Sequence, residues 1–187
     1  MKKIIILLIC LTCLSTASNS QEKLKINISK STIKWIGEYT FYFGGHDGFI
    51  QLKSGHFIKT GAVITGGEFV IDMNSISNTD IKKKKGKKSL VNHLKEPDFF
   101  DVKKYPLAKL VITKVKYSDP THARLEADLT LKGIKKPINF KAELNYDKKE
   151  IKTRFKIDRR AWNVSYKSTV KDGAISDAIG FEVTLKL

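Results

Sequence analysis

Residues 124–133, RLEADLTLKG, decide the fold class because apolar and polar side chains alternate along them without a break. Successive side chains of a β-strand point to opposite faces of a sheet, so alternation of this kind gives a strand one apolar and one polar face. The apolar face holds Leu125, Ala127, Leu129 and Leu131. The stretch therefore predicts a strand of an antiparallel sheet that is buried on one side only.

The same alternation recurs along the chain, in INFKAELNY (138–146) and in FEVTLKL (181–187). Further apolar stretches that read as strands are STIKWIG (31–37), GFIQLKSGHFI (48–58), AVITGGEFVIDMNSI (62–76), LAKLVITKVKY (107–117) and IKTRFKID (151–158). Turn signals such as paired glycines separate them, and no long helical period interrupts them. About eight strands in this arrangement predict an all-β sandwich or barrel, and a barrel removes exposed sheet edges.

The first twenty residues have the pattern of a secretory signal peptide. Lys2 and Lys3 precede an apolar run, IIILLICLTCL (4–14), and small polar residues follow it. The apolar run is too short for a transmembrane helix, which needs about 20 residues. We therefore expect an exported, periplasmic protein whose single domain spans residues 21–187, with cleavage after Ala17 or Ser20.

Both cysteines, Cys10 and Cys13, lie inside the predicted signal peptide. The expected mature chain has no cysteine, which excludes disulfides, thiolate catalysis and cysteine-ligated metals. Ile9 and Thr12 precede the cysteines where a lipidation site has a small residue, so a lipid-anchored form is disfavoured.

The chain is strongly basic, with 35 Lys and Arg against 19 Asp and Glu and a net charge of +16. An exported protein rarely meets nucleic acid, and the lysines are not interleaved with exposed aromatic residues, so we expect no nucleic-acid partner. An anionic membrane surface or an acidic ligand fits the charge better. The densest run is KKKKGKK, with Lys82, Lys83, Lys84, Lys85, Lys87 and Lys88. This run predicts either a membrane contact or simply a solvated loop.

An insertion of about thirty residues separates the predicted strands on either side of residues 77–106. Ser89 is positioned to cap a short helix over residues 90–94, which would end before Pro97. The insertion then reads DFFDVKKYP (98–106), with Phe99 and Phe100 adjacent. We expect one ring to face the barrel interior and the other to pack against the wall. The alternative is that both rings plug a fully packed core.

Five blocks of the sequence, in order, resemble the signature blocks of the YceI-like family. They are GGHDGFIQLKSGHF (44–57), TGGEFVIDMNSI (65–76), HLKEPDFFDVKKYPLAKLVIT (93–113), LTLKGIKKPINF (129–140) and FKIDRRAWNVSY (155–166). The resemblance implies an eight-stranded antiparallel lipocalin-like barrel with one long helix or loop insertion. It also implies an apolar cavity that holds one long-chain amphiphile, such as an isoprenoid quinone, a prenyl phosphate or a fatty amphiphile. Family members are often dimeric and have no established catalytic residues, so we expect a non-catalytic binding protein without a cofactor.

Eight apolar residues are the candidates for the wall of such a cavity. They are Trp35, Phe69, Ile71, Phe99, Phe100, Phe155, Ile157 and Trp162. For each of them a place in an ordinary packed core is the competing interpretation. A packed core would instead favour a basic interaction module that docks on an anionic membrane or a protein, and a polar cluster deep in the cavity would favour a lipid-modifying enzyme.

The histidines do not predict a metal site. His46 and His56 have the same parity and could converge across a hairpin, and Asp47 is adjacent to His46, but two histidines without a clear third ligand do not suffice to predict a metal site. Asp158 stands beside Arg159 and Arg160, next to Trp162, and these charges predict a structural contact at a strand end, with an arginine near a ligand head group as the alternative. Neither feature predicts catalysis.

Overall fold

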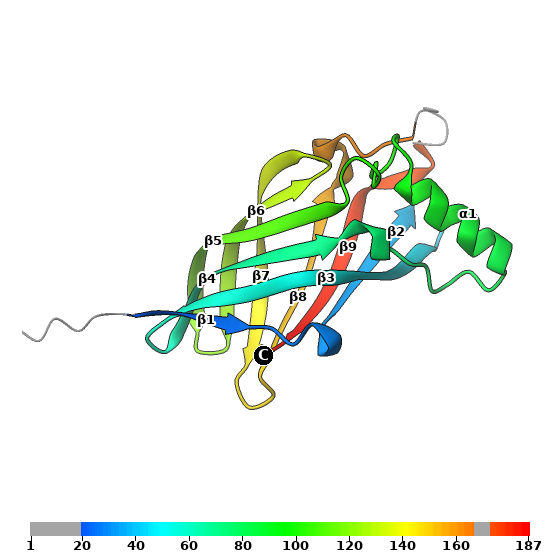
Figure 1. Ribbon diagram of the computed structural model, residues 1–187. Helices are drawn as coiled ribbons and strands as arrows, with labels where there is room; N and C mark the ends of the chain where they lie inside the picture. Colours follow the sequence, from blue (N-terminus) through cyan, green and yellow to red (C-terminus); the bar gives the residue numbers. More distant parts are fainter. Residues whose placement is uncertain (1–19, 167–172) are drawn as a thin grey trace, which may run out of the picture.

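The computed structural model describes residues 20–166 and 173–187, which fold into one β-barrel with a short helix across one end (Figure 1). The predicted signal peptide lies outside the described residues, apart from Ser20. The strands are β1 (Gln21–Lys25), β2 (Thr32–Tyr39), β3 (Gly45–Thr60), β4 (Val63–Asp72), β5 (Leu107–Asp119), β6 (His122–Leu131), β7 (Ile134–Asn145), β8 (Glu150–Asp158) and β9 (Ile175–Lys186). Helical elements among the described residues include α1 (Lys84–Lys95) and the short 3-10 turns η1 (Ile28–Lys30), η2 (Met73–Ser75) and η3 (Arg159–Trp162).

Strands β2 to β9 form a closed antiparallel ring, in which each strand pairs with its neighbours in sequence and β9 pairs back with β2. The predicted eight-stranded antiparallel barrel is thus confirmed. Strand β1 is an addition to the ring. Because β3 is 16 residues long, β2 pairs with its first part and β1 pairs with its last part, from His56 to Thr60.

Alternation along the strands sorts the side chains between the barrel interior and water, as the sequence predicts. On β6, Leu125, Ala127, Leu129 and Leu131 are all buried, and the intervening residues are half-buried or exposed. The alternation of buried and exposed side chains stops where a strand ends. Tyr146 follows β7 and Leu187 follows β9, and both side chains are exposed. The inward faces of all eight strands contribute to one continuous apolar core.

Strands β7 and β8 share the shortest stretch of backbone pairing in the barrel wall. They pair only from Ala142 to Asn145 of β7. Beyond that point aromatic side chains bridge the strands. The rings of Phe140 and Phe155 stack with centroids 4.6 Å apart, and the ring of Phe181 on β9 lies 5.3 Å from that of Phe155. Ring contacts therefore hold together the part of the wall that the ladder leaves unpaired.

The insertion contains a longer helix than predicted. Helix α1 begins at Lys84 rather than near Leu90, so Ser89 lies inside the helix and not at its start, and the first helical turn has no side-chain cap. Glu96 ends it, before Pro97, as predicted. Leu94 is buried against the barrel end, and Leu90 packs beside it. In the described residues, no helix is both long enough and apolar enough to cross a membrane.

The segment that leads from β4 to α1 is tied to the start of β3. The backbone N–H of Ser77 donates to Phe49 O (2.9 Å), and the Trp35 indole donates to Ser77 O (2.9 Å). A Cβ at Gly48 would lie 1.8 Å from Ser77 O. This close approach of two backbones requires glycine at position 48.

Gly48→Ala is expected to lower the free energy of unfolding by about 1–3 kcal/mol, because the new methyl group displaces the Ser77 carbonyl and weakens its bond to Trp35. Gly37→Ala is the matched control on the facing strand, where the nearest atom to an added Cβ is 3.8 Å away. Urea unfolding followed by Trp fluorescence measures both variants. Equal stability of the two variants would contradict the packing described for Gly48.

Candidate functional site

The barrel encloses a cavity of about 310 Å³, in the range of small-ligand sites. Its wall is formed by the inward side chains of the strands, together with Leu90 and Leu94 of α1 and Phe99 and Phe100 of the insertion. Along β9 the lining extends from Leu185 to Ile175, which corresponds to roughly 33 Å of strand length. We call this space the barrel cavity. Its elongated apolar shape suits a chain-like ligand.

Seven of the eight residues predicted from the sequence lie in the wall of the barrel cavity. They are Trp35, Phe69, Ile71, Phe99, Phe100, Phe155 and Ile157. The eighth, Trp162, is not among the lining residues. It lies in η3, is 3% exposed, and donates its indole N–H to Leu129 O (3.2 Å). Trp162 therefore supports the wall from behind.

The two adjacent phenylalanines differ from the prediction, because both line the barrel cavity. Residues 96–102 form turns rather than a strand, with Phe99 N–H and Asp101 N–H both donating to Glu96 O. Strand alternation does not apply in such a turn, so both rings can point inward. The rings of Phe99 and Phe100 meet edge to face at 5.0 Å, and Phe99 also meets Tyr166 edge to face at 5.7 Å.

A small group of polar side chains lines the same cavity at the end covered by α1, and the sequence indicated only an arginine among them as a candidate neighbour of a head group. The group consists of Glu38, Tyr39, His46, Arg159, Tyr166 and Ser176. Arg159 is 1% exposed and donates to Val164 O (2.7 Å) and Ser176 O (3.0 Å), and it pairs with Asp177. Asp158 makes a structural contact, because it caps η3 by accepting from Arg160 N–H, while Arg159 lines the cavity, which is the alternative that the sequence left open.

Two of these polar residues, Tyr39 and His46, form a chain with Asp80 that links the hairpin to the insertion. Asp80 accepts from Asp47 N–H (2.9 Å) and lies 2.8 Å from His46 Nδ1, and Tyr39 Oη lies 2.9 Å from His46 Nε2. A carboxylate can only accept, so Nδ1 carries the proton shared with Asp80. In the neutral imidazole, Nε2 then accepts from the Tyr39 hydroxyl. The chain fixes the orientation of the His46 ring at the cavity wall.

The carboxylates of this network are held in their charged form. Burial raises the pKa of Asp80, but hydrogen bonds from His46, Asp47 N–H and Asn78 outweigh it and place the pKa below the usual value. Hydrogen bonds from Thr79 and Lys34 lower the pKa of Asp47. The Lys34 ammonium lies 2.9 Å from Asp47. Negative charge is therefore stable at the base of the hairpin near neutral pH.

The arrangement does not resemble a metal centre. Within the part of the chain that the structure describes, no three His, Cys, Asp or Glu side chains come together in a way that could hold a metal ion. His46 and His56 lie on one strand, β3, and not across a hairpin, so their ten-residue separation spans roughly 33 Å. The chemistry of the site is thus a long apolar surface with hydrogen-bonding groups at one end.

Comparison with known protein families matches residues 20–187 to the YceI-like domain. The relatives by sequence include UPF0312 proteins of Pseudomonas putida strain W619, 48% identical over 58 residues, and of Pseudomonas savastanoi pv. phaseolicola, 47% identical over 58 residues. These matches span 31% of this chain and 30% of each relative.

Solved structures show the same fold at low sequence identity. Burkholderia cenocepacia BcnA has a TM-score of 0.68 at 18% identity, with 86% of this chain and 98% of that chain covered. A polyisoprenoid binding domain from Saccharophagus degradans, implicated in plant cell wall breakdown, has a TM-score of 0.58 at 13% identity, with 86% and 95% covered. A Campylobacter jejuni YceI protein has a TM-score of 0.51 at 21% identity, with 98% and 97% covered.

Asp80→Asn is expected to lower the free energy of unfolding at pH 7 by about 1–2 kcal/mol, because it removes the charged acceptor of His46 and Asp47 N–H. The folded pKa of Asp80 is depressed, so its stabilisation is fully present above the unfolded pKa near 4 and is lost as the pH falls through the folded value. Urea unfolding at several pH values from 7 to 2 measures the difference between variant and parent.

Asp147→Asn is the control, because it removes one carboxylate from an exposed turn. The difference between Asp80→Asn and the parent should shrink toward zero at the lowest pH. A difference that stays constant from pH 7 to pH 2 would show that the Asp80 charge does not stabilise the hairpin base.

Proposed function

The chain belongs to the YceI-like family, and from this premise we propose that it binds a long-chain isoprenoid or a similar amphiphilic lipid, non-covalently, in the barrel cavity. The fold-related polyisoprenoid binding domain of Saccharophagus degradans supports the ligand class. Candidate ligands are an isoprenoid quinone, a prenyl phosphate or a fatty amphiphile. The protein would sequester or carry this ligand through an aqueous compartment, which the predicted signal peptide places outside the cytoplasm.

The observation that carries the proposal is the long apolar cavity closed by the insertion. Burial of one methylene contributes about 0.8 kcal/mol, so a five-carbon isoprene unit contributes roughly 3 kcal/mol before the cost of ordering the chain. A few units along the aromatic and aliphatic wall suffice for tight binding. No charged side chain lines the middle of the wall, where Leu52, Leu125 and Ile151 lie, so the site favours an apolar tail there.

The polar end of the barrel cavity is the expected position of the ligand's head group. Tyr39 and Tyr166 carry hydroxyls there, and the Arg159 guanidinium adds a positive charge. A quinone carbonyl or a phosphate oxygen accepts hydrogen bonds, and the Tyr166 hydroxyl and the Arg159 guanidinium are donors at this end, whereas the Tyr39 hydroxyl donates to His46. This arrangement supports a ligand with an acceptor head and an apolar tail.

The alternative of a basic module with a packed core is less well supported, because the interior of the barrel holds a cavity and not close-packed side chains. An enzymatic role lacks support from the family, and we propose that binding involves no chemical step. The polar group lies at one end of the cavity, and its members take part in bonds that link β2 and β3 to the insertion and η3 to β9, which favours positioning over catalysis.

A quinone titration tests the proposal directly, because quinones quench tryptophan and Trp35 lines the cavity whereas Trp162 does not. The delipidated protein should show saturable quenching with one long-chain quinone per chain. The chain has two tryptophans, so Trp162→Phe leaves only Trp35, and this variant should retain the quenching. Trp35→Phe should lose most of it. Quenching carried mainly by Trp162 would contradict the proposed position of the ligand.

Ala108→Phe is expected to weaken quinone binding at least about tenfold, because its ring occupies space that about two methylenes of the ligand would fill. Ala108 is buried in the cavity wall on β5. Lys114→Phe adds the same ring on the same strand at an exposed position and serves as the control. Circular dichroism verifies that both variants fold. Unchanged affinity in a folded Ala108→Phe protein would exclude the cavity as the binding site.

A further inference from the structure

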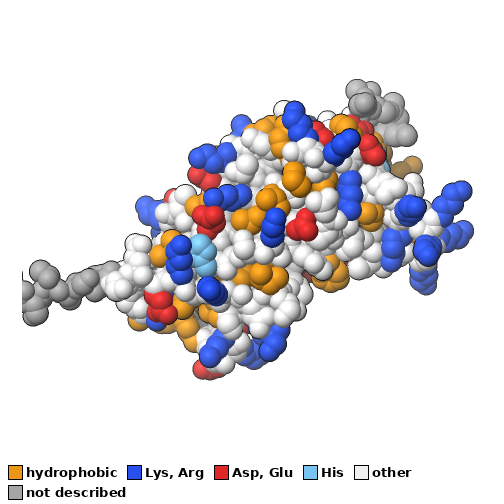
Figure 2. All heavy atoms as spheres, viewed as in Figure 1, with side chains coloured by type: hydrophobic (Ala, Val, Ile, Leu, Met, Phe, Trp, Pro, Cys, Tyr) orange, Lys and Arg blue, Asp and Glu red, His pale blue; other side chains and the backbone are white. Residues whose placement is uncertain are grey.

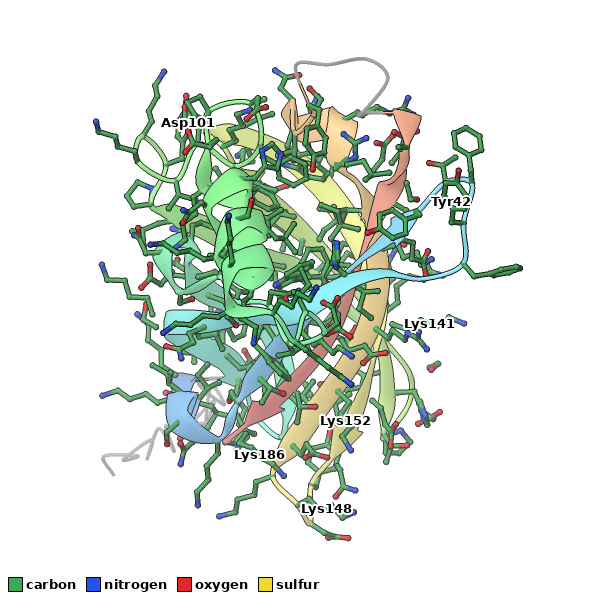
Figure 3. The ribbon with its side chains drawn as sticks, turned by 90° about the vertical axis from the view of Figure 1, so that its right-hand side faces the viewer. Tyr42, Asp101, Lys141, Lys148, Lys152 and Lys186 are labelled. Carbon is green, nitrogen blue, oxygen red and sulfur yellow. The ribbon has the colours of Figure 1, made fainter. Side chains whose placement is uncertain are left out.

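The hairpin between β2 and β3 carries three aromatic side chains in water. Phe41 and Tyr42 are 74% and 76% exposed, and Phe43 is fully exposed. Figure 3 shows Tyr42 on a hairpin that projects away from the barrel body. We call residues 41–43 the aromatic tip. Three consecutive exposed rings place a large apolar area in water without any intramolecular gain, and such patches mark interaction sites.

The base of this hairpin is rigid. Tyr39 N–H donates to Gly44 O (3.1 Å), and the chain of Tyr39, His46 and Asp80 ties both strands to the insertion. The base of the hairpin that carries the aromatic tip is therefore held beside residues 78–81. The aromatic tip does not fold back onto the barrel.

The lysine run, residues 82–88, begins two residues after Asp80. Lys82, Lys83, Lys84 and Lys85 are exposed, and none of the lysines in the run forms an ion pair with the described residues. Figure 2 shows Lys and Arg side chains gathered at the end of the molecule where α1 lies. Figure 3 looks onto this end and shows α1 on one side of it and the projecting hairpin on the other.

The acidic residues near the hairpin do not neutralise the lysine run, because each has another partner. Glu38 pairs with Lys156 (3.0 Å), Asp47 with Lys34 (2.9 Å), and Asp80 with His46 (2.8 Å). Among the described residues, this end of the barrel therefore presents lysines without an ion pair on one side and exposed aromatic rings on the other.

We propose that the aromatic tip and the lysine run together form a docking surface for an anionic lipid bilayer. Aromatic rings are favoured at the level of lipid head groups, and lysines near an anionic surface gain attraction that adds over the residues. Neither feature anchors a protein stably alone, whereas a small apolar insertion combined with a basic patch does.

The position of this surface relative to the barrel cavity favours a bilayer over a protein partner. The cavity-lining residues Glu38, Tyr39 and His46 flank the aromatic tip on both sides in the sequence, and Leu90 and Leu94 of α1 line the same end. Docking through the tip and the lysine run places this end of the cavity at the membrane surface. Lysine ammonium groups are mobile point charges, which suit a fluid layer of phosphates better than a single fixed carboxylate.

Co-sedimentation with vesicles tests the proposal. The purified protein is mixed with two kinds of vesicle. One is phosphatidylcholine alone, and the other is phosphatidylcholine with about 30% phosphatidylglycerol, an anionic content that gives a strong negative surface potential. We expect strong binding to the anionic vesicles and weak binding to the neutral ones. The variant F41S/Y42S/F43S should bind anionic vesicles about tenfold more weakly, and K82Q/K83Q/K84Q/K85Q on the order of a hundredfold more weakly.

The control removes the same charge elsewhere, at four exposed lysines away from α1 that have no ion pair with the described residues: Lys25, Lys114, Lys141 and Lys148. Changing these to Gln should reduce binding much less than changing the lysine run. Equal loss in the two lysine variants would show that net charge alone drives binding, and unchanged binding of the aromatic variant would show that the tip does not insert. Either result, or equal binding to both vesicle types, overturns the proposal.

Quinone quenching of Trp35 is measured on the same variants and should be unchanged, since the substituted side chains lie outside the barrel cavity. Failure of docking and failure of ligand binding are thus separate outcomes.

Discussion

Pairing of β9 with β2 closes the sheet, and the other features of the structure depend on this closure. A closed antiparallel ring sends every second side chain of eight strands into one enclosed volume. The wall then needs no further layer on its outer face, which is free to carry the basic and acidic residues of a soluble surface. The two ends of such a barrel are the places that the strands themselves cannot seal. At one of them, α1 and the turns that follow it supply the cover.

The cover is built from side chains rather than from backbone pairing. The side chains of Leu94, Phe99 and Phe100 are buried beneath this cover. They pack against the end of the core and also line the barrel cavity. The ring of His93 stacks on that of Tyr166 at 4.2 Å, which adds a second contact between the insertion and the segment after η3. Lysines in the first turns of α1 face the positive end of the helix dipole and gain nothing from it. Packing beneath the helix, not its own termini, must therefore hold it in place.

Most of the strands could be predicted from the sequence because period-two alternation is a local signal, as on β6. The start of α1 could not, because the lysine run resembles a solvated loop and Ser89 resembles a helix cap. The position of Trp162 behind the wall could not be predicted, because β8 ends at Asp158 and Trp162 lies in η3, where strand alternation no longer applies. Asp80 and His46 are 34 residues apart, and nothing in the intervening sequence signals their contact. The burial of Phe99 and Phe100 could be predicted from their adjacency in a polar segment. That both rings point into the barrel cavity depends on the turn geometry, which the sequence does not show.

The central claim is that the barrel cavity holds an apolar chain in the functioning protein. The most direct measurement is native mass spectrometry of the protein purified, without delipidation, from the cells that make it, followed by organic extraction and lipid analysis. The account predicts a mass increment of one ligand per chain and an extracted isoprenoid or fatty amphiphile in matching amount. A mass equal to that of the protein alone, unchanged after incubation with quinones and prenyl phosphates, would contradict it.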